Sequence, residues 1–188
     1  MTRTLLWMAI GLLLAGVVHI VSILAIPKLA PNDAFLRLQR FGEANQMHVI
    51  PPMTPRSQPL IDMDPTMRYA VCSFDLSQAP LRLFAKIPPT YWVATFYDRH
   101  GVSFYTINDR SIAADQIELW LATKQQLLDY DLSPDDEEQQ RLIIGAPEEL
   151  GFVLIRLIVP ETSMNTTVRD ALAASECASL EATGSLQR

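Results

Sequence analysis

Residues 91–109 read YWVATFYDRHGVSFYTIND, and this stretch decides the fold class. Two runs rich in β-branched and aromatic residues, 91–97 and 102–107, flank the turn sequence 98–101, which ends in Gly101. Such side chains favour strands, and a short link with glycine between two of these runs is typical of a β-hairpin. Asn108 and Asp109 add a turn signal directly after the second run. The stretch therefore predicts two neighbouring antiparallel strands.

Further strands are predicted on both sides of this hairpin. A β-rich or alternating composition recurs in residues 67–76, 81–87, 117–121, 141–145 and 151–159. Within the second of these runs, Leu81, Leu83, Ala85 and Ile87 fall on one face of a strand. The Ala-rich residues 168–180 favour a helix instead. Together these patterns predict an α+β fold, a β-rich domain with a mainly antiparallel sheet and a C-terminal helix.

The N-terminal residues 5–26 contain no Asp, Glu, Lys or Arg. A helix of this length rises about 33 Å, enough to cross the hydrocarbon core of a bilayer. Nearly every face is apolar, whereas a buried helix of a soluble protein keeps a polar stripe. A cleaved signal peptide is the alternative, but the run is too long and lacks a convincing Ala-x-Ala site. We therefore expect an uncleaved transmembrane anchor that ends at Pro27.

The charges on either side of this anchor do not determine which of its ends lies in the cytoplasm. Arg3 precedes the helix, whereas Lys28, Arg37 and Arg40 follow it, so the positive-inside rule does not decide the matter. A short N-terminus before a single anchor usually stays in the cytoplasm. We therefore expect residues 28–188 to lie outside the cytoplasm.

Small and polar residues share one face of the anchor: Gly11, Ala15, His19 and Ser22. Membrane helices pack closely along such stripes, and a histidine within one can form a hydrogen bond to a partner helix. This pattern predicts docking to another membrane helix. The alternative is that His19 lies near the membrane boundary and reaches the lipid headgroups.

The chain divides into three parts by composition. Residues 1–27 form the transmembrane anchor, residues 28–60 a juxtamembrane helix and a Pro-rich connector, and residues 61–188 the β-rich domain. Asn32 and Asp33 can cap the short helix, which places Phe35 and Leu38 on one side. Four prolines between Pro51 and Pro59 then predict an extended spacer or a strap over the domain.

Composition excludes some classes of function. Hydrophobic residues make up 49% of the 188 residues and charged residues only 19%, which favours a lipid-facing segment. The net charge of −6 repels phosphate backbones, so no nucleic-acid partner is expected. The partners expected from the sequence are membrane lipid and a membrane or envelope protein.

The aromatic hairpin is a candidate site for a sugar or a lipid-like ligand. Rings can cover apolar ligand faces while carboxylate and amide groups bind hydroxyls. The candidate ligand-binding residues are Tyr91, Trp92, Tyr97, Asp98, Tyr105 and Asn108. The alternative is that these residues fill the core and pair across strands.

No metal or cofactor is predicted. Residues 129–133 open like a calcium loop, but Pro134 stands where the loop needs glycine and Gln140 where it needs a bidentate Glu. His48 and His100 lie in different segments, so no zinc spacing is formed. None of the common catalytic motifs occurs, and no catalytic residues are assigned.

The two cysteines, Cys72 in a predicted strand and Cys177 in the predicted terminal helix, are candidates for a disulfide. Both fall in the part expected outside the cytoplasm, where disulfides persist. A bond would fix the C-terminal helix to the sheet. The alternative is that both thiols fill core volume.

Three stretches together resemble a known family. Residues 64–77 (DPTMRYAVCSFDLS), 88–92 (PPTYW) and 104–109 (FYTIND) resemble the bacterial family of domain of unknown function 1254, in its short, membrane-anchored form from proteobacteria. The resemblance implies an α+β, sheet-based fold and a membrane location. Together with the expected orientation of the anchor, this predicts a single-pass protein of the bacterial inner membrane with its C-terminal domain in the periplasm. It implies no catalytic residues.

These observations lead to two hypotheses of function. The first is a single-pass envelope protein whose outer domain is a binding or scaffolding module in a larger assembly. The second is an anchored envelope enzyme or binding domain that takes a sugar or lipid-like ligand through the hairpin at residues 91–109.

Overall fold

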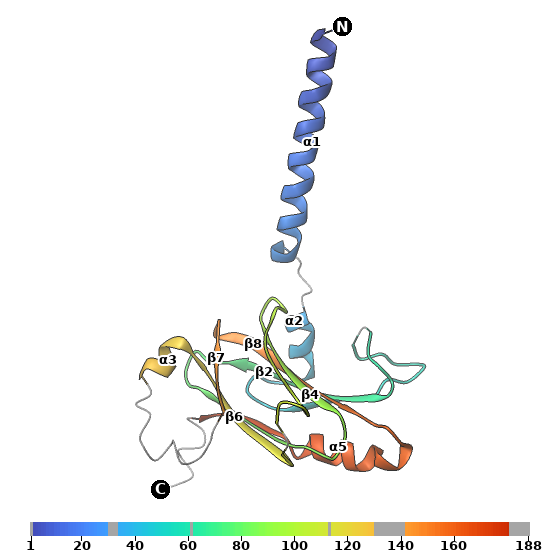
Figure 1. Ribbon diagram of the computed structural model, residues 1–188, viewed down its shortest axis with the longest axis vertical. Helices are drawn as coiled ribbons and strands as arrows, with labels where there is room; N and C mark the ends of the chain where they lie inside the picture. The colour runs from blue at the N-terminus through green and yellow to red at the C-terminus, as the bar shows by residue number, and fades with distance from the viewer. Residues whose placement is uncertain (1, 30–33, 61, 113, 130–141, 181–188) are drawn as a thin grey trace. The chain divides into compact units, whose positions relative to one another are not determined.

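The computed structural model describes residues 2–29, 34–60, 62–112, 114–129 and 142–180, and divides the chain into two units, Met1–Asp33 and Ala34–Arg188 (Figure 1). The first unit contains helix α1, Thr2–Leu29. Its segment Thr2–Ile26 is long and apolar enough to cross a membrane, and its large apolar side chains are exposed. The prediction that Pro27 ends the helix is wrong. A proline in the last turn removes one hydrogen bond, and the helix continues to Leu29.

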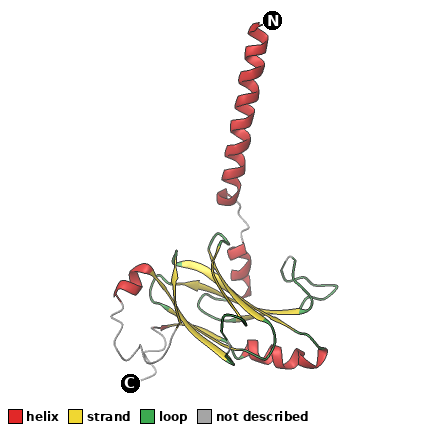
Figure 2. Ribbon diagram, in the orientation of Figure 1, coloured by secondary structure: helices red, strands yellow, loops and turns green. Residues whose placement is uncertain are grey.

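The second unit confirms the predicted β-rich, mainly antiparallel fold with a helix near the C-terminus, and its strands form two β-sheets where one was expected (Figure 2). The larger sheet has five antiparallel strands in the order β1 (His48–Ile50), β2 (Met67–Asp75), β8 (Leu150–Ile158), β4 (Trp92–Asp98) and β5 (Ser103–Asn108). The smaller sheet has the order β7 (Leu142–Ala146), β6 (Gln116–Thr123), β3 (Leu81–Lys86) and β9 (Glu176–Ser179). Its β6 and β7 are parallel and its other pairs antiparallel.

The main core lies between the two sheets. Leu81, Leu83 and Ala85 of β3 are at most 1% exposed, which confirms the predicted alternation. Phe74, Trp92 and other apolar residues of the larger sheet belong to the same buried cluster. A strand of alternating polarity has one apolar face that must be buried. Each of the two sheets covers the apolar face of the other, which is why the strands form two layers and not one.

A smaller buried cluster involves helix α2, Ala34–Leu38, which η1 (Gln39–Phe41) follows. Phe35 and Leu38 of α2 are buried with Tyr69, Val71 and Phe152. Arg37 and Arg40, in contrast, are exposed. The connector contributes Met53 and Leu60 to this cluster, as expected for a strap over the domain. The predicted caps Asn32 and Asp33 lie outside the described residues.

The C-terminal region corrects one prediction. Residues 168–180 were expected to form one helix, but helix α5 covers Asn165–Ala173, after η2 (Thr162–Met164), and β9 follows it. Strand β9 pairs with β3, with Cys177 opposite Leu83. This pairing to a distant strand overrides the helix propensity of the Ala-rich segment. Val168 and Leu172 of α5 are buried in the main core.

A disulfide joins Cys72 to Cys177, whose Cα atoms are 6.4 Å apart. Cys72 lies in β2 of the larger sheet and Cys177 in β9 of the smaller one, so the bond connects the two sheets and not a sheet to a helix. The two cysteines are 105 residues apart in the sequence. Closing a loop of that length contributes about 4–5 kcal/mol in the chain-entropy model. The disulfide therefore stabilises the two-layer arrangement.

Candidate functional site

The strands of the aromatic hairpin alternate between two environments. Trp92 is 2% exposed and belongs to the core between the sheets. Tyr105 packs against that core, edge-on to Phe96 with ring centroids 6.0 Å apart. Tyr97 belongs to the opposite face of β4 and stacks on Phe152 at 4.8 Å. The aromatic rings therefore pack on both sides of the sheet.

The polar candidates of the hairpin hold its turns. The Asp98 carboxylate accepts hydrogen bonds from the backbone N–H groups of His100 (2.8 Å) and Val102 (2.9 Å). The Asn108 side-chain oxygen accepts them from the backbone of Arg110 and Ser111 and from the Ser111 hydroxyl. Tyr91, just before β4, is 43% exposed. The six candidate residues therefore do not converge on one pocket.

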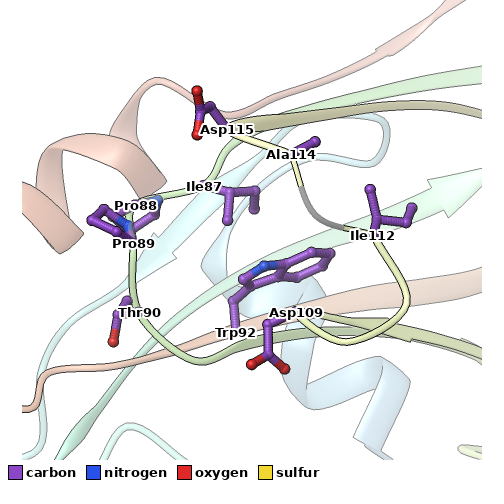
Figure 3. Close-up of a pocket in the computed structure, with 9 residues that line it drawn as sticks. All are labelled: Ile87, Pro88, Pro89, Thr90, Trp92, Asp109, Ile112, Ala114 and Asp115. Carbon is purple, nitrogen blue, oxygen red and sulfur yellow. The ribbon is translucent and has the colours of Figure 1, made fainter.

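The structure instead contains a cleft of about 360 Å³ beside this hairpin (Figure 3). It lies where the chain crosses twice between the sheets, from β3 to β4 and from β5 to β6. We call it the crossover cleft, and its lining residues are Ile87, Pro88, Pro89, Thr90, Trp92, Asp109, Ile112, Ala114 and Asp115. Its volume falls within the range of about 300–1,000 Å³ that is usual for small-molecule sites.

Backbone hydrogen bonds hold the two crossovers together. Ile87 donates its N–H to the Asp115 carbonyl oxygen at 2.8 Å, and Asp109 donates its N–H to the Trp92 carbonyl oxygen at 3.3 Å. The Thr90 hydroxyl donates to the Ile158 carbonyl oxygen at 3.1 Å, which ties the β3–β4 crossover to β8. The walls of the cleft are thus fixed by the sheets on either side.

The charged side chains of the cleft are acidic. Asp109 and Asp115 line it, and no Lys, Arg or His is among its lining residues. Figure 3 shows their carboxylates toward opposite ends of the lining, with Ile87 and the Trp92 indole between them. The Oδ1 atom of Asp109 is buried and accepts no hydrogen bond from any described residue.

Other charged groups have structural roles away from the cleft. The hydrogen bond from Arg82 to Glu118 (2.8 Å) raises the pKa of the Arg82 guanidinium and links β3 to β6. The Thr66 hydroxyl (2.6 Å) and backbone N–H (2.8 Å) lower the pKa of the Asp64 carboxyl. No three or more His, Cys, Asp or Glu side chains of the described residues gather as metal ligands. Residues 130–141, which contain most of the stretch compared above with a calcium loop, lie outside the described part.

The predicted helix-packing residues all lie in α1. Gly11, Ala15, His19 and Ser22 are exposed, and a Cβ atom on Gly11 would meet no other atom within 4 Å. Ser22 donates its hydroxyl to the Val18 carbonyl oxygen at 2.8 Å, one turn earlier in the same helix. The docking of this stripe to another helix stays a prediction.

Sequence reasoning placed a ligand site on the neighbouring residues and missed most of the cleft. Of the six candidates, Trp92 alone lines it. In the sequence, Pro88 and Pro89 mark only the end of the predicted strand at residues 81–87, and Asp109 belongs to a predicted turn. One sequence pattern could have located the cleft. A Pro-Pro pair comes before the first strand of the aromatic hairpin, and an Asp follows the second strand, so the pattern marks two connections that lie side by side.

A comparison with protein-family models assigns the chain to a family. Residues 44–177 match the model of the family described as "Protein of unknown function (DUF1254)". The chain belongs to the DUF1254 family. The matched DUF1254 domain begins before β1 and ends within β9, so it includes both sheets and both cysteines. No protein among the curated sequences matches the chain.

Two solved structures match part of this chain. The VPA0106 protein of Vibrio parahaemolyticus matches 78% of this chain at 9% identity, with a TM-score of 0.57. An uncharacterised protein of Burkholderia cenocepacia matches 72% of the chain at 12% identity, with a TM-score of 0.45. The chain spans about a third of each of these proteins, 33% and 34% respectively. The first match confirms the fold of the domain.

Proposed function

We propose that this protein is a single-pass protein of the bacterial inner membrane whose DUF1254 domain serves as a periplasmic binding or scaffolding module in a larger assembly. The observation that carries the proposal is helix α1. Its segment Thr2–Ile26 meets the length and apolarity of a membrane span, and its large apolar side chains are exposed. A helix with exposed apolar side chains on every face requires lipid or other helices around it.

The disulfide supports the placement of the domain outside the cytoplasm. Disulfides persist in oxidising compartments such as the periplasm and are rare in the bacterial cytosol. Both cysteines are bonded, and the described residues contain no free thiol. With α1 as a single uncleaved anchor, a periplasmic domain places the N-terminal end of α1 on the cytoplasmic side of the membrane.

One observation supports a role in an assembly. The stripe Gly11, Ala15, His19 and Ser22 gives one face of α1 the small and polar side chains along which another membrane helix can pack closely.

Site-specific photo-crosslinking in intact cells tests this function. A photoreactive amino acid replaces Ala15, within the stripe, and in a matched control replaces Leu13, on about the opposite face of the helix. We expect a discrete protein adduct from position 15 and not from position 13. Equal adducts from both positions, or none from either, would contradict a helix partner on this stripe.

Reporter fusions test the orientation independently. A C-terminal alkaline phosphatase, which is active only outside the cytoplasm, should be active. A fluorescent protein that matures only in the cytoplasm should be dark at the same position. The opposite pair of results would place the domain in the cytoplasm and overturn this proposal.

A further inference from the structure

One side of helix α2 and of η1, which follows it, is fixed to the DUF1254 domain. Phe35 and Leu38 are only 6% and 5% exposed and belong to the smaller buried cluster, together with apolar residues of β2 and β8. Phe41 of η1 packs against the same cluster. Because residues three apart lie on one side of a helix, the opposite side is held in a fixed orientation at the surface.

The exposed side of α2 and η1 is basic and carries one large apolar residue. Leu36 is 47% exposed, and Arg37 and Arg40 are exposed as well. Neither guanidinium group forms an ion pair with any described residue. We call Leu36, Arg37 and Arg40 the basic face.

The charge of this part of the chain is opposite to that of the whole. Residues 28–41 contain three basic residues and one acidic residue, whereas the chain has a net charge of −6. A membrane that contains anionic lipids has a negative surface potential, which attracts basic residues next to a membrane anchor. Helices that lie in the interface combine such basic residues with apolar side chains that reach the acyl boundary. The basic face has both kinds of side chain.

The length of the chain brings α2 close to the bilayer. Residues 30–33 separate α1 from α2 in the sequence. Even a fully extended chain of this length spans at most about 18 Å between the Cα atoms of Leu29 and Ala34. The headgroup layer is about 5–8 Å thick on each side of a bilayer. With α1 across the membrane, α2 therefore begins within reach of the headgroups.

A protein partner fits the basic face less well than lipid does. The buried centre of a protein interface is depleted of charged residues, whereas two of the three residues of the basic face are charged. Lipid headgroups supply the phosphate groups that arginine side chains bind with charge-assisted hydrogen bonds.

We propose that the basic face docks the DUF1254 domain onto the anionic headgroups of the membrane that α1 spans. Arg37 and Arg40 bind lipid phosphates, and Leu36 inserts at the level of the acyl boundary. This inference rests on the membrane anchor of the proposed function, but it requires no partner for the stripe on α1.

Fluorescence quenching in lipid nanodiscs tests the docking. The full chain carries Gln39→Cys, an exposed position beside the basic face, and the new thiol is labelled with a fluorophore while Cys72 and Cys177 stay bonded. The matched control is Thr167→Cys, exposed on α5, whose buried residues belong to the main core. The nanodiscs contain a nitroxide-labelled lipid as quencher, in phosphatidylcholine alone or in an equimolar mixture with phosphatidylglycerol.

We expect stronger quenching at position 39 in the anionic mixture than in phosphatidylcholine alone, and no such difference at position 167. The double variant Arg37→Gln/Arg40→Gln should lower the ratio of docked to undocked domains by about tenfold or more, because each basic residue at an anionic surface contributes about fivefold. Arg110→Gln/Arg169→Gln removes the same charge from exposed positions outside α2 and η1 and should change this ratio little. Near-ultraviolet circular dichroism checks that both variants are folded.

The failure of the docking can be distinguished from that of the anchor. Chains that do not enter nanodiscs would overturn the anchor and this inference together. Chains that enter them but show equal quenching at position 39 in both lipid compositions, or an unchanged ratio in the folded double variant, would overturn the docking alone. A label at position 39 that is shielded from water in native membrane vesicles but not in nanodiscs would indicate a protein on the basic face and would contradict the proposal.

Discussion

Two regions of the domain can be compared: the core between the two sheets and the crossover cleft at their connections. Both contain Ile87 and Trp92, but they differ in the polarity of their other residues. The space between the sheets is closed by apolar side chains, and a disulfide crosses it. In the cleft, an aspartate keeps a buried oxygen without a described donor. The first region is a close-packed apolar core, whereas the second is a surface cleft lined by apolar and acidic residues. The difference indicates that the packing that stabilises the domain lies between the sheets and not at their connections.

Truncation of one side chain in each region should produce the largest contrast. Leu119 of β6 is fully buried between the sheets, so Leu119→Ala should lower the free energy of unfolding by about 2–5 kcal/mol. Ile112 lines the cleft and is half-buried, so Ile112→Ala should cost about 1 kcal/mol or less. Urea unfolding of the full chain in micelles measures both. Equal losses of unfolding free energy in the two variants would contradict a difference in packing between the core and the cleft.

Two glycines test how closely neighbouring atoms pack against the backbone of each sheet. A Cβ atom on Gly151 of β8 would collide with the Tyr97 carbonyl oxygen and the Phe74 ring, so Gly151→Ala should cost about 1–3 kcal/mol. Gly145 of β7 is exposed, and the nearest atom to an added Cβ is Leu127 Cδ1 at 3.6 Å, an ordinary contact. Gly145→Ala is therefore the matched control and should leave stability nearly unchanged. A destabilisation by Gly145→Ala as large as that by Gly151→Ala would refute close packing at β8.

The smallest effect concerns a surface turn outside both regions. Thr66→Val removes the hydroxyl hydrogen bond that lowers the pKa of Asp64, so that pKa should rise toward its ordinary value. Because the folded pKa is below the unfolded one, the ionised carboxylate stabilises the wild-type fold above about pH 4, and this stabilisation is lost as pH falls through the folded pKa. The variant should lose it at a higher pH. Carboxyl titration by NMR measures the shift, and an identical titration of Asp64 in both proteins would contradict it.

Local patterns in the sequence predicted much of the fold because their causes are local. The alternation of Leu81, Leu83 and Ala85 and the Gly101 turn each depend on neighbouring residues, and the structure confirms both. The division into two sheets depends on β2 pairing with β8 rather than with β3, which no local pattern encodes. Likewise, β9 forms in an Ala-rich segment because β3 offers it a distant partner.

The candidate site was less accessible to sequence reasoning for the same reason. Strand alternation alone divides Trp92 from Tyr97, so the aromatic hairpin was a weaker candidate than its composition suggested. The cleft requires Ile87 and Asp115 to meet across two connections, and the sequence does not specify that contact. The pairing of Cys72 and Cys177 was left open because sequence sets no distance between them.

Thiol counting tests most directly the central claim, a two-sheet domain joined by a disulfide outside the cytoplasm. The full-length protein is taken from the envelope fraction under acid quench, denatured, and labelled with a maleimide before and after reduction, and the added mass is measured. We predict no labelled cysteine before reduction and two after it, since the chain contains only Cys72 and Cys177 and both are bonded. Two labelled cysteines before reduction would contradict both the bond between the sheets and the placement of the domain.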